Sequence, residues 1–481
     1  FHLLYNLLLP TSKISITSID SNYKKTTNGN ITRTVSDFLN DEVRSFANYV
    51  ISSRCCPGID GLKIGARKLL HAAFKGGLKD GSEKKLPTLI GDCYVHSMYA
   101  HGDQSAYGTA VTLGSEFLDN LNPLEIPSQH GSLRDPNVCA APRYLFCKLS
   151  KYAKLLYKVD EDLLEYVFDE GEYLEPVNYL PIIPLTLCAR NEGMAPGYKF
   201  SSFSYNPIDI IDACTDIIKS GKIKTVIRPY VRGIKQDKFV WDAEVNRWFN
   251  IGTYSIDEKN DVLQISDLPY DVTYNKFEKK LNSYKESGYI KDWKIFSHDD
   301  ILDYRILFNK SKLSREAQPD KKDQLIKKFM LSSMVPNDLL YVLDEHGKVK
   351  HFTNKEDLIE YFVKFRLFKY NDRKNRLVKV KEQQYEDNSN LCKFIELVTS
   401  GKLVINNRKI SDIKEELNAY NLPISLLQVQ ISKLTQEEKD EILKRNKEIE
   451  QELEYIKNTT IEQMYLDDLK ALRKELINDF N

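Results

Sequence analysis

A tyrosine directly follows an arginine in Pro142-Arg143-Tyr144, and this pair can do covalent chemistry on a phosphodiester. A tyrosine hydroxyl can act as a nucleophile, and its attack on a DNA phosphate would leave a phosphotyrosine bond that stores the energy for resealing. Negative charge builds on the phosphate oxygens during the attack, so cations must lie beside them. Arg143 can supply one. The pair alone is a weak signal, because the chain contains 28 tyrosines.

His101 is the third candidate catalytic residue, after Tyr144 and Arg143, although a lone histidine is more often structural than catalytic. Four further cations are candidates for binding DNA phosphates: Arg54, Lys63, Arg67 and Lys68. They lie in a basic stretch, since residues 54–85 contain eight bases and three acids. Residues 160–175 contain eight acids and no base. Two solvated faces of opposite sign would explain this equally well. The functional interpretation is a basic groove that neutralises phosphates.

Several common active sites are absent from the sequence. There is no GxxxxGK[ST] phosphate loop, no GxGxxG after a strand, no HExxH and no GxSxG. These absences argue against an ATPase, a dehydrogenase, a zinc protease and an α/β-hydrolase. We also find no compact group of carboxylates suited to a divalent metal. We therefore predict no metal site in this chain.

The composition is that of a globular chain with balanced charge. The 481 residues carry 69 Lys and Arg against 69 Asp and Glu, and 42% are hydrophobic. This excludes a uniformly basic protein but not a DNA-binding protein whose charge is segregated. No apolar run approaches the roughly 20 residues of a membrane helix, so we expect no membrane partner. The eight cysteines include no CxxC pair, which is typical of reduced thiols in an intracellular protein.

The elements that position these residues follow from hydrophobic spacing. Residues 1–35 are predicted to form an N-terminal arm with strand character. Since the first residue is not methionine, we expect that residues precede it. Helical spacing begins after Ser36, a predicted N-cap, and a second helix is predicted over Lys63–Phe74. Further short helices up to Ser150 favour a winged-helix module.

The rest of the chain divides into an α+β part and a helical part. Strands are predicted at Ile223–Val231 and Val262–Ile265. Capping boxes begin predicted helices at Thr353–Glu356, Thr435–Glu438 and Thr460–Gln463. The apolar spacing in these helices suits packing against each other within one chain. At this length we expect two to four domains.

Five ordered segments resemble motifs of type IIA DNA topoisomerases. Asp60–Leu70 (DGLKIGARKLL) resembles the family's DGLKPxxRxxL, and His101–Ser105 (HGDQS) resembles its HGD/E-x-S loop. Ala141–Phe146 (APRYLF) resembles SPRYIF, the segment that holds the active-site tyrosine. Tyr179–Pro184 (YLPIIP) resembles YxPIIP. The last 60 residues, with Lys457–Thr460 and Leu466–Leu469, resemble the family's helical return. From the first segment to the last, they span about 420 residues of the chain.

The resemblance implies the DNA breakage-reunion subunit of an ATP-dependent type IIA topoisomerase. Tyr144 would be the nucleophile that forms a transient 5′-phosphotyrosyl link while a second duplex passes, and Arg143 the neighbouring cation. Arg54, Lys63, Arg67 and His101 would line the phosphate path. Met194 falls where the family places a residue that wedges between bases. A loop methionine packed on its own domain would be the plain alternative.

The implied fold is α+β and multidomain. Residues 36–165 would form a winged-helix DNA-gate domain and residues 166–350 an α/β tower domain. Residues 351–481 would form a long helical coiled coil ending in a dimerisation gate. The length and layout resemble the breakage subunit of tailed-phage topoisomerases, and the spacing within the motifs favours the phage and eukaryotic branch. We therefore expect host cytoplasm for a phage protein, or the nucleus for a eukaryotic one.

The implied partners are double-stranded DNA, a second copy of the chain, and a Toprim/ATPase portion that binds Mg²⁺ and ATP. That portion would be a separate large subunit, giving a heterotetramer, or a region missing from this sequence. Some features depart from the family. Ile64 stands where proline is usual, and Ala100-His101 offers one histidine where many members have two. A non-catalytic dimeric DNA-binding scaffold that keeps the topoisomerase fold is therefore the alternative. A tyrosine recombinase is disfavoured, because it needs a differently spaced Arg/His set.

Overall fold

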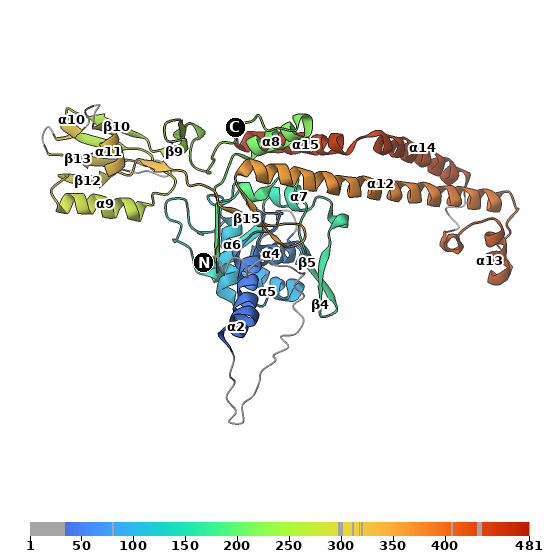
Figure 1. The fold of residues 1–481 in the computed structure, drawn as a ribbon. Coiled ribbons are helices and arrows are strands. Elements are labelled where there is room, and N and C mark those ends of the chain that lie inside the picture. Colours follow the sequence, from blue (N-terminus) through green and yellow to red (C-terminus); the bar gives the residue numbers. More distant parts are fainter. Residues whose placement is uncertain are drawn as a thin grey trace, which may run out of the picture. The chain divides into compact units, whose positions relative to one another are not determined.

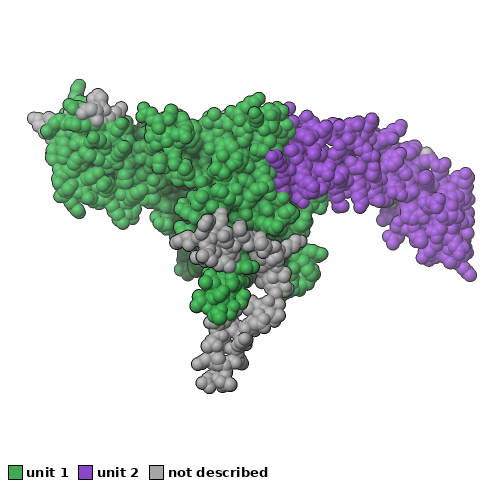
Figure 2. Space-filling view, in the orientation of Figure 1, with its two compact units in different colours: residues 1–363, 471–481 green, residues 364–470 purple. Residues whose placement is uncertain are grey.

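The computed structural model describes residues 34–78, 81–296, 302–309, 312–316, 318, 321–405, 407–430 and 435–480. The chain divides into two compact units, residues 1–363 with 471–481, and residues 364–470 (Figure 2). Most of the predicted N-terminal arm lies outside the described residues, and the predicted domain boundaries stay predictions. Among the described residues, no helix has both the length and the apolar character needed to cross a membrane.

The first unit begins with a group of helices (Figure 1). They are α2 (Val35–Phe38), the π-helix η1 (Leu39–Val43), α3 (Arg44–Val50), the π-helix η2 (Ile51–Cys55), α4 (Ile64–Lys75), α5 (Leu86–Ser97) and α6 (Asp103–Gly114). The first four segments follow one another without a break. Thr34 begins them, because its Oγ1 accepts a hydrogen bond from the backbone N of Asp37 at 3.1 Å. The predicted cap at Ser36 is therefore wrong by two residues.

Helix α4 confirms the prediction of a helix over Lys63–Phe74. It runs one residue further, to Lys75, and Gly76 closes it through a backbone bond to Ala72. Its inner face contributes Leu69, Leu70 and Ala73, none of which is exposed. This buried face fixes the helix against its neighbours, so the direction of every polar side chain on it is also fixed.

A short antiparallel sheet carries the segment with Tyr144. Its strands, in the order β1-β3-β2, are β1 (Lys84–Lys85), β2 (Leu124–Glu125) and β3 (Phe146–Leu149). The 3-10 helix η3 (Pro142–Tyr144) leads into β3 through the buried Leu145, and the backbone N of Leu86 donates to the Leu145 carbonyl at 2.9 Å. The start of α5 is thereby tied to the residue that follows Tyr144.

The first unit also contains three hairpins and several further helices. The hairpins are β4 (Tyr166–Asp169) with β5 (Glu172–Pro176), β6 (Asn191–Ala195) with β7 (Tyr198–Ser202), and β15 (Leu340–Leu343) with β16 (Val349–Phe352). The helices are α7 (Lys151–Tyr157), η4 (Glu161–Leu163), η5 (Leu185–Leu187) and α8 (Pro207–Ser220).

Two further antiparallel sheets follow α8 in the chain. The first has the order β14-β9-β8, from β8 (Phe239–Asp242), β9 (Arg247–Ile251) and β14 (Ser332–Met334). The second has the order β10-β11-β13-β12, from β10 (Tyr254–Asp257), β11 (Val262–Ile265), β12 (Asp292–Ile295) and β13 (Tyr304–Leu307). The helices here are η6 (Gln236–Lys238), α9 (Tyr274–Glu286), α10 (Lys312–Glu316) and α11 (Lys322–Lys328). Buried residues such as Leu263, Phe277 and Leu325 join the second sheet to α9 and α11 in one core.

One strand prediction in this part is confirmed and one is wrong. Val262–Ile265 is β11, whereas Ile223–Val231 is irregular apart from one bridge at Pro229. The reason is that carboxylates of α8 take the backbone donors that a strand would use. Asp216 accepts from the backbone of Lys224 and Thr225, and Asp209 accepts from that of Arg228.

The second unit contains paired helices. The elements that reach into it are α12 (Lys355–Thr399), α13 (Ile410–Ala419), η7 (Ile424–Gln428), α14 (Gln436–Asn458) and α15 (Ile461–Phe480). Helices α12 and α14 run antiparallel, as three polar contacts along them show: Glu396 with Lys439, Ser389 with Asn446, and Glu382 with Lys457. At the start of α15, Tyr465 stacks on Tyr370 with ring centroids 4.7 Å apart.

Two of the three predicted capping residues are confirmed. Thr435 accepts from the backbone N of Glu438, and Thr460 from that of Gln463, both at 3.2 Å. For α12 the prediction of Thr353 is wrong by one residue, because Asn354 Oδ1 accepts from Asp357 N at 2.8 Å. Asparagine is at least as good a cap as threonine.

A buried ion pair holds α4 to the rest of the first unit. Arg67 donates through Nε and an Nη to both carboxylate oxygens of Asp60, at 2.7 and 2.8 Å. Asp60 is completely buried and Arg67 is 6% exposed. The same carboxylate accepts from the backbone of Leu62 and Tyr179. Burial would lower the pKa of Arg67, but the Asp60 charge outweighs it and the pKa is raised.

We therefore expect Arg67→Ala to lower the free energy of unfolding by about 3–5 kcal/mol, because it leaves the Asp60 charge buried and unpaired. Urea unfolding followed by circular dichroism measures this. Arg54→Ala is the matched control, since Arg54 is exposed, and it should change stability by less than about 1 kcal/mol. Equal effects of the two substitutions would contradict the structural role of Arg67.

Candidate functional site

Tyr144 is an exposed candidate catalytic residue on a fixed backbone. It ends η3, where its N–H donates to the Ala141 carbonyl at 2.9 Å, and its side chain is 62% exposed. The guanidinium carbon of Arg143 lies 5.2 Å from the centre of the Tyr144 ring. The structure thus keeps the predicted pair together, with the phenol open to solvent and a cation at its side.

Lys85 is a cation on β1, the strand next to β3, and was not among the predicted site residues. It is exposed and pairs in register with Phe146, two residues beyond Tyr144. The Lys85 backbone therefore lies on a strand ladder that begins two residues after Tyr144. Only the β1–β3 pairing reveals this, because the two segments are about 60 residues apart in the sequence.

His101 lies in an aromatic cluster with Arg54 close by. Its Nε2 is 3.2 Å from the hydroxyl of Tyr49, and its ring meets Tyr99 edge-on with centroids 5.4 Å apart. The guanidinium carbon of Arg54 lies 5.8 Å from the centre of the Tyr49 ring. Tyr49 therefore contacts two of the predicted phosphate-binding residues, although it was not itself a predicted site residue.

Lys63 and Met194 meet through the β6–β7 hairpin. Lys63 precedes α4, and its Nζ donates to the carbonyl of Glu192 on β6 at 2.6 Å. Burial lowers the pKa of Lys63, and the nearby Cys55 and Cys56 thiols oppose that shift. Met194 lies two residues along β6 and is 70% exposed. The ammonium group of Lys63 thus holds the strand that presents Met194.

Gly193 lets this hairpin approach the Arg54 segment closely. A Cβ at Gly193 would overlap the carbonyl oxygen of Cys55, the residue after Arg54. A side chain of any kind would push the hairpin away, so glycine here is required by close backbone contact.

Arg67 and Lys68 have internal partners instead of an open face. Arg67 binds Asp60, as described above. Lys68 Nζ lies 2.9 Å from Glu175 and 2.5 Å from the Ser97 carbonyl. Both charges are neutralised within the fold, so we do not propose Arg67 and Lys68 as DNA contacts.

The site residues fall into two groups at opposite ends of α5. Leu86, its first residue, is bonded to Leu145 beside Tyr144. His101 follows the left-handed turn at Met98 that closes the helix, where φ is 45°. The 12 residues of α5 span about 18 Å. Within one chain, Tyr144 and Arg143 are therefore separated from His101, Tyr49 and Arg54.

The described residues do not fit a metal centre of their own. Nowhere in the described ranges do three or more His, Cys, Asp or Glu side chains converge as metal ligands would. A divalent metal at this site would need ligands from elsewhere, and we derive no step through one.

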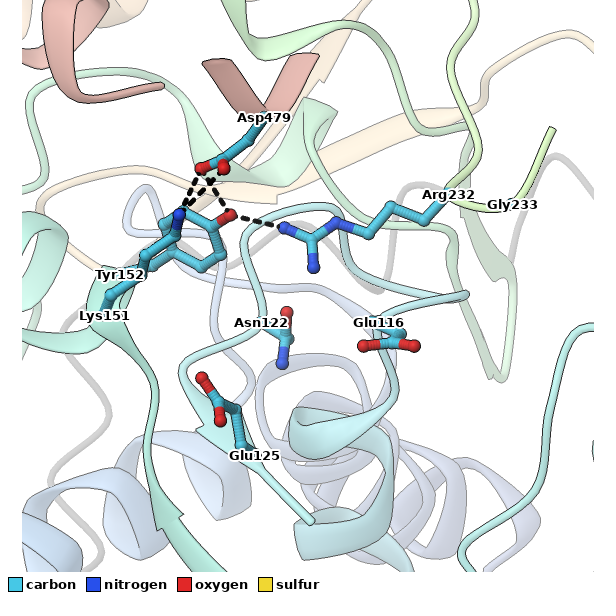
Figure 3. A pocket seen from close by; sticks show the side chains of 8 residues that line it. All are labelled: Glu116, Asn122, Glu125, Lys151, Tyr152, Arg232, Gly233 and Asp479. Atoms are coloured by element: carbon cyan, nitrogen blue, oxygen red, sulfur yellow. Dashed lines mark hydrogen bonds and ion pairs between the residues drawn. The ribbon is translucent and has the colours of Figure 1, made fainter. Parts of the chain in front are cut away.

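A separate cavity of about 480 Å³ is lined by residues of neither group (Figure 3). Its polar lining is largely paired: Asp479 binds Lys151 and the Tyr152 hydroxyl, and Arg232 donates to that hydroxyl at 2.6 Å. Burial would raise the pKa of Asp479, but the bonds from Lys151 and Tyr152 outweigh it and the pKa is lowered. These contacts anchor the end of α15 to the start of α7.

The comparison with known proteins identifies the family. Residues 54–471 match the family model that describes the A-subunit of DNA gyrase/topoisomerase IV. The chain belongs to this family. The predicted resemblance to type IIA topoisomerases is thereby confirmed.

The relatives of this topoisomerase-family chain include eukaryotic enzymes. It is 32% identical to the mitochondrial DNA topoisomerase 2 of Dictyostelium discoideum, over 80% of this chain and 30% of that protein. It is 30% identical to DNA topoisomerase 2 of Plasmodium falciparum, over 92% of this chain and 34% of that protein. The chain thus spans about a third of the length of these curated relatives.

A solved structure resembles the fold. It is the crystal structure of the DNA-binding, cleavage and re-ligation domain of Plasmodium falciparum topoisomerase II. The match has a TM-score of 0.80 and 28% identity, and it covers 92% of this chain and 64% of that one. The predicted mixed helix-and-strand architecture is confirmed at this level.

The contact between Gly193 and Cys55 gives a test of the hairpin position. We expect Gly193→Ala to lower the free energy of unfolding by about 1–3 kcal/mol, because the new methyl group forces two backbones apart. Gly91→Ala is the control. Gly91 lies within α5 and has no atom near the position of an added Cβ. Alanine there should therefore raise the free energy of unfolding by about 0.5–1 kcal/mol. Thermal unfolding of both variants measures the difference, and a neutral Gly193→Ala would refute the close contact.

Proposed function

We propose that this chain is the DNA breakage-reunion part of an ATP-dependent type II topoisomerase, with Tyr144 as the nucleophile. The observation that carries the proposal is the exposed Tyr144, held beside Arg143 on an anchored backbone, in a chain of the gyrase/topoisomerase IV family. The similar Plasmodium structure is a DNA-binding, cleavage and re-ligation domain.

The chemistry is a reversible exchange of one phosphodiester for another. The Tyr144 oxygen attacks a backbone phosphorus, the new P–O bond joins the tyrosine to the 5′ end, and the bond to the 3′ oxygen breaks. The 3′ oxygen gains a proton and the tyrosine hydroxyl loses one, so no water or nucleotide is consumed. Resealing is the reverse attack by the 3′ hydroxyl. Because the bond energy is kept, the break can close after a second duplex has passed.

Cations and hydrogen-bond donors from both groups would stabilise the charged phosphate oxygens. Arg143 lies beside Tyr144 and the exposed Lys85 is paired with Phe146, while Arg54 and His101 lie beyond the far end of α5. Fixed positive charges aimed at developing negative charge are usually the largest catalytic contribution. The span of α5 supports a homodimer in which Tyr144 of one copy meets Arg54 and His101 of the other.

Met194 would act as a wedge in the DNA. It stands exposed on a hairpin that Lys63 and the Cys55 backbone hold in place. An apolar side chain inserted at a base step unstacks it and bends the duplex. Lys63 would then affect DNA binding indirectly, because it holds the hairpin in place.

Magnesium and ATP would be bound outside this chain's described residues, in a Toprim/ATPase portion on a partner subunit or elsewhere in a longer chain. We assign the N-terminal helices and the β1–β3 sheet to a winged-helix DNA gate, the β8–β14 region to a tower, and α12 to α15 to a coiled coil with a dimerisation gate. An intracellular location, with access to DNA, follows from the same proposal.

The first test is the covalent DNA adduct. With the Toprim-bearing partner and Mg²⁺, end-labelled duplex should be trapped on this chain by SDS, and Tyr144→Phe should remove the adduct completely, because phenylalanine has no nucleophile. Tyr173→Phe is the control, since Tyr173 is 74% exposed but lies on β5, and it should keep the adduct. If Tyr144→Phe still forms covalent DNA, the nucleophile is wrong. If the wild type forms none with an active partner, the scaffold alternative holds.

The second test is complementation between two inactive variants. Tyr144→Phe and His101→Ala should each form almost no adduct alone, whereas a mixture should regain single-strand nicking. Only a dimer that joins Tyr144 of one copy to His101 of the other can rebuild one complete site. The control is Tyr144→Phe alone, taken through the same mixing step. A mixture that stays inactive while the two variants demonstrably exchange subunits would contradict the shared site.

A further inference from the structure

Tyr49 and Arg54 lie on the same side of their helix because of a π-turn. In a π-helix the backbone pairs residue i with residue i+5. Helix η2 has this pattern, with the N–H of Cys56 bonded to the carbonyl of Ile51 at 3.0 Å, and Tyr49 and Arg54 are five residues apart. A regular α-helix would place residues five apart on different faces. The π-turn instead brings the Arg54 guanidinium over the Tyr49 ring.

The Tyr49 hydroxyl also fixes the imidazole of His101. Its oxygen is 3.2 Å from Nε2, and the edge-on Tyr99 ring limits rotation of the imidazole. The bond made by one ring nitrogen decides which nitrogen carries the proton. When Tyr49 donates to Nε2, the proton sits on Nδ1, which then can donate to a phosphate oxygen.

The surroundings separate the role of Tyr49 from that of a second nearby tyrosine. The Tyr94 hydroxyl bonds the Asp103 carboxylate at 2.5 Å and lies 3.4 Å from the backbone carbonyl of His101, so Tyr94 holds the loop. Tyr49 contacts the imidazole itself. Tyr49 is 39% exposed, so its hydroxyl is not needed to fill the core.

We propose that Tyr49 is a positioning residue for DNA cleavage. Its hydroxyl orients His101 and its ring orients Arg54, so that both groups point toward the same phosphate. This inference rests on the proposed function. It predicts that the hydroxyl and the ring of Tyr49 have separable effects.

Two substitutions at Tyr49 separate these effects in the complex with the Toprim-bearing partner. Tyr49→Phe keeps the ring and loses the hydroxyl, so single-turnover cleavage should slow about tenfold, which is the order expected for the loss of one hydrogen bond. Its pH profile should shift, while DNA affinity stays unchanged. Tyr49→Ala should show the same slowing and also bind DNA several-fold more weakly, because Arg54 loses its support.

A double mutant and a control make the test specific. In a His101→Ala background, Tyr49→Phe should cause no further slowing, since the two residues act through one contact. Tyr455→Phe removes a hydroxyl from a tyrosine that is 66% exposed on α14 and should change nothing. Slowing by Tyr49→Phe that is as large without His101 as with it would overturn the inference.

A spectroscopic measurement on the full chain alone distinguishes this inference from the proposed function. With ¹⁵N-labelled histidine, the imidazole signals of His101 are identified by their loss in His101→Gln. Tyr49→Phe should change their shifts, which report the tautomer. Unchanged signals would overturn the inference even in an active enzyme. Changed signals in a complex that forms no adduct would overturn the proposed function instead, and with it the catalytic role of Tyr49.

Discussion

The buried charge of Asp60 must be neutralised before this part of the chain can fold, and Arg67 does so. The two-pronged contact fixes the direction of α4, and the remaining lone pairs of the carboxylate accept from the backbone of Leu62 and Tyr179. One carboxylate therefore joins the turn before α4 to a segment more than 100 residues later. Lys63 lies within that turn, so its contact with Glu192 and the position of the Met194 hairpin depend on the same pair.

The second constraint is the length of α5. A hydrogen bond from its first residue holds the strand that follows Tyr144, and the turn after its last residue places His101. A rigid helix of about 18 Å separates Tyr144 from the Arg54 and His101 group. Each group is held by its own contacts, Tyr144 by β3 and His101 by Tyr49 and Tyr99. In the proposed mechanism, a site divided in this way would be complete only where two copies meet on a duplex.

The sequence was sufficient to predict α4, β11 and the Arg143-Tyr144 pair, because local spacing and short motifs determine them. The strand prediction for Ile223–Val231 was wrong. Its β-branched residues favour a strand, but carboxylates on α8 accept hydrogen bonds from its backbone N–H groups. The sequence also could not separate Arg54, which is exposed, from Arg67, which is buried, since the partner of a cation is a tertiary property. Lys85 and Tyr49 were missed for the same reason: strand pairing places Lys85 opposite Phe146, and a contact across 52 residues places Tyr49 beside His101.

The most direct test of the central claim is to identify the residue that carries DNA after cleavage. The adduct formed with the Toprim-bearing partner is digested with trypsin and nuclease and analysed by mass spectrometry. Trypsin cuts after Arg143 and Lys148, so we predict a nucleotide on the peptide Tyr144–Lys148. A nucleotide on any other tyrosine, or an adduct only on the partner, would contradict the assignment of Tyr144.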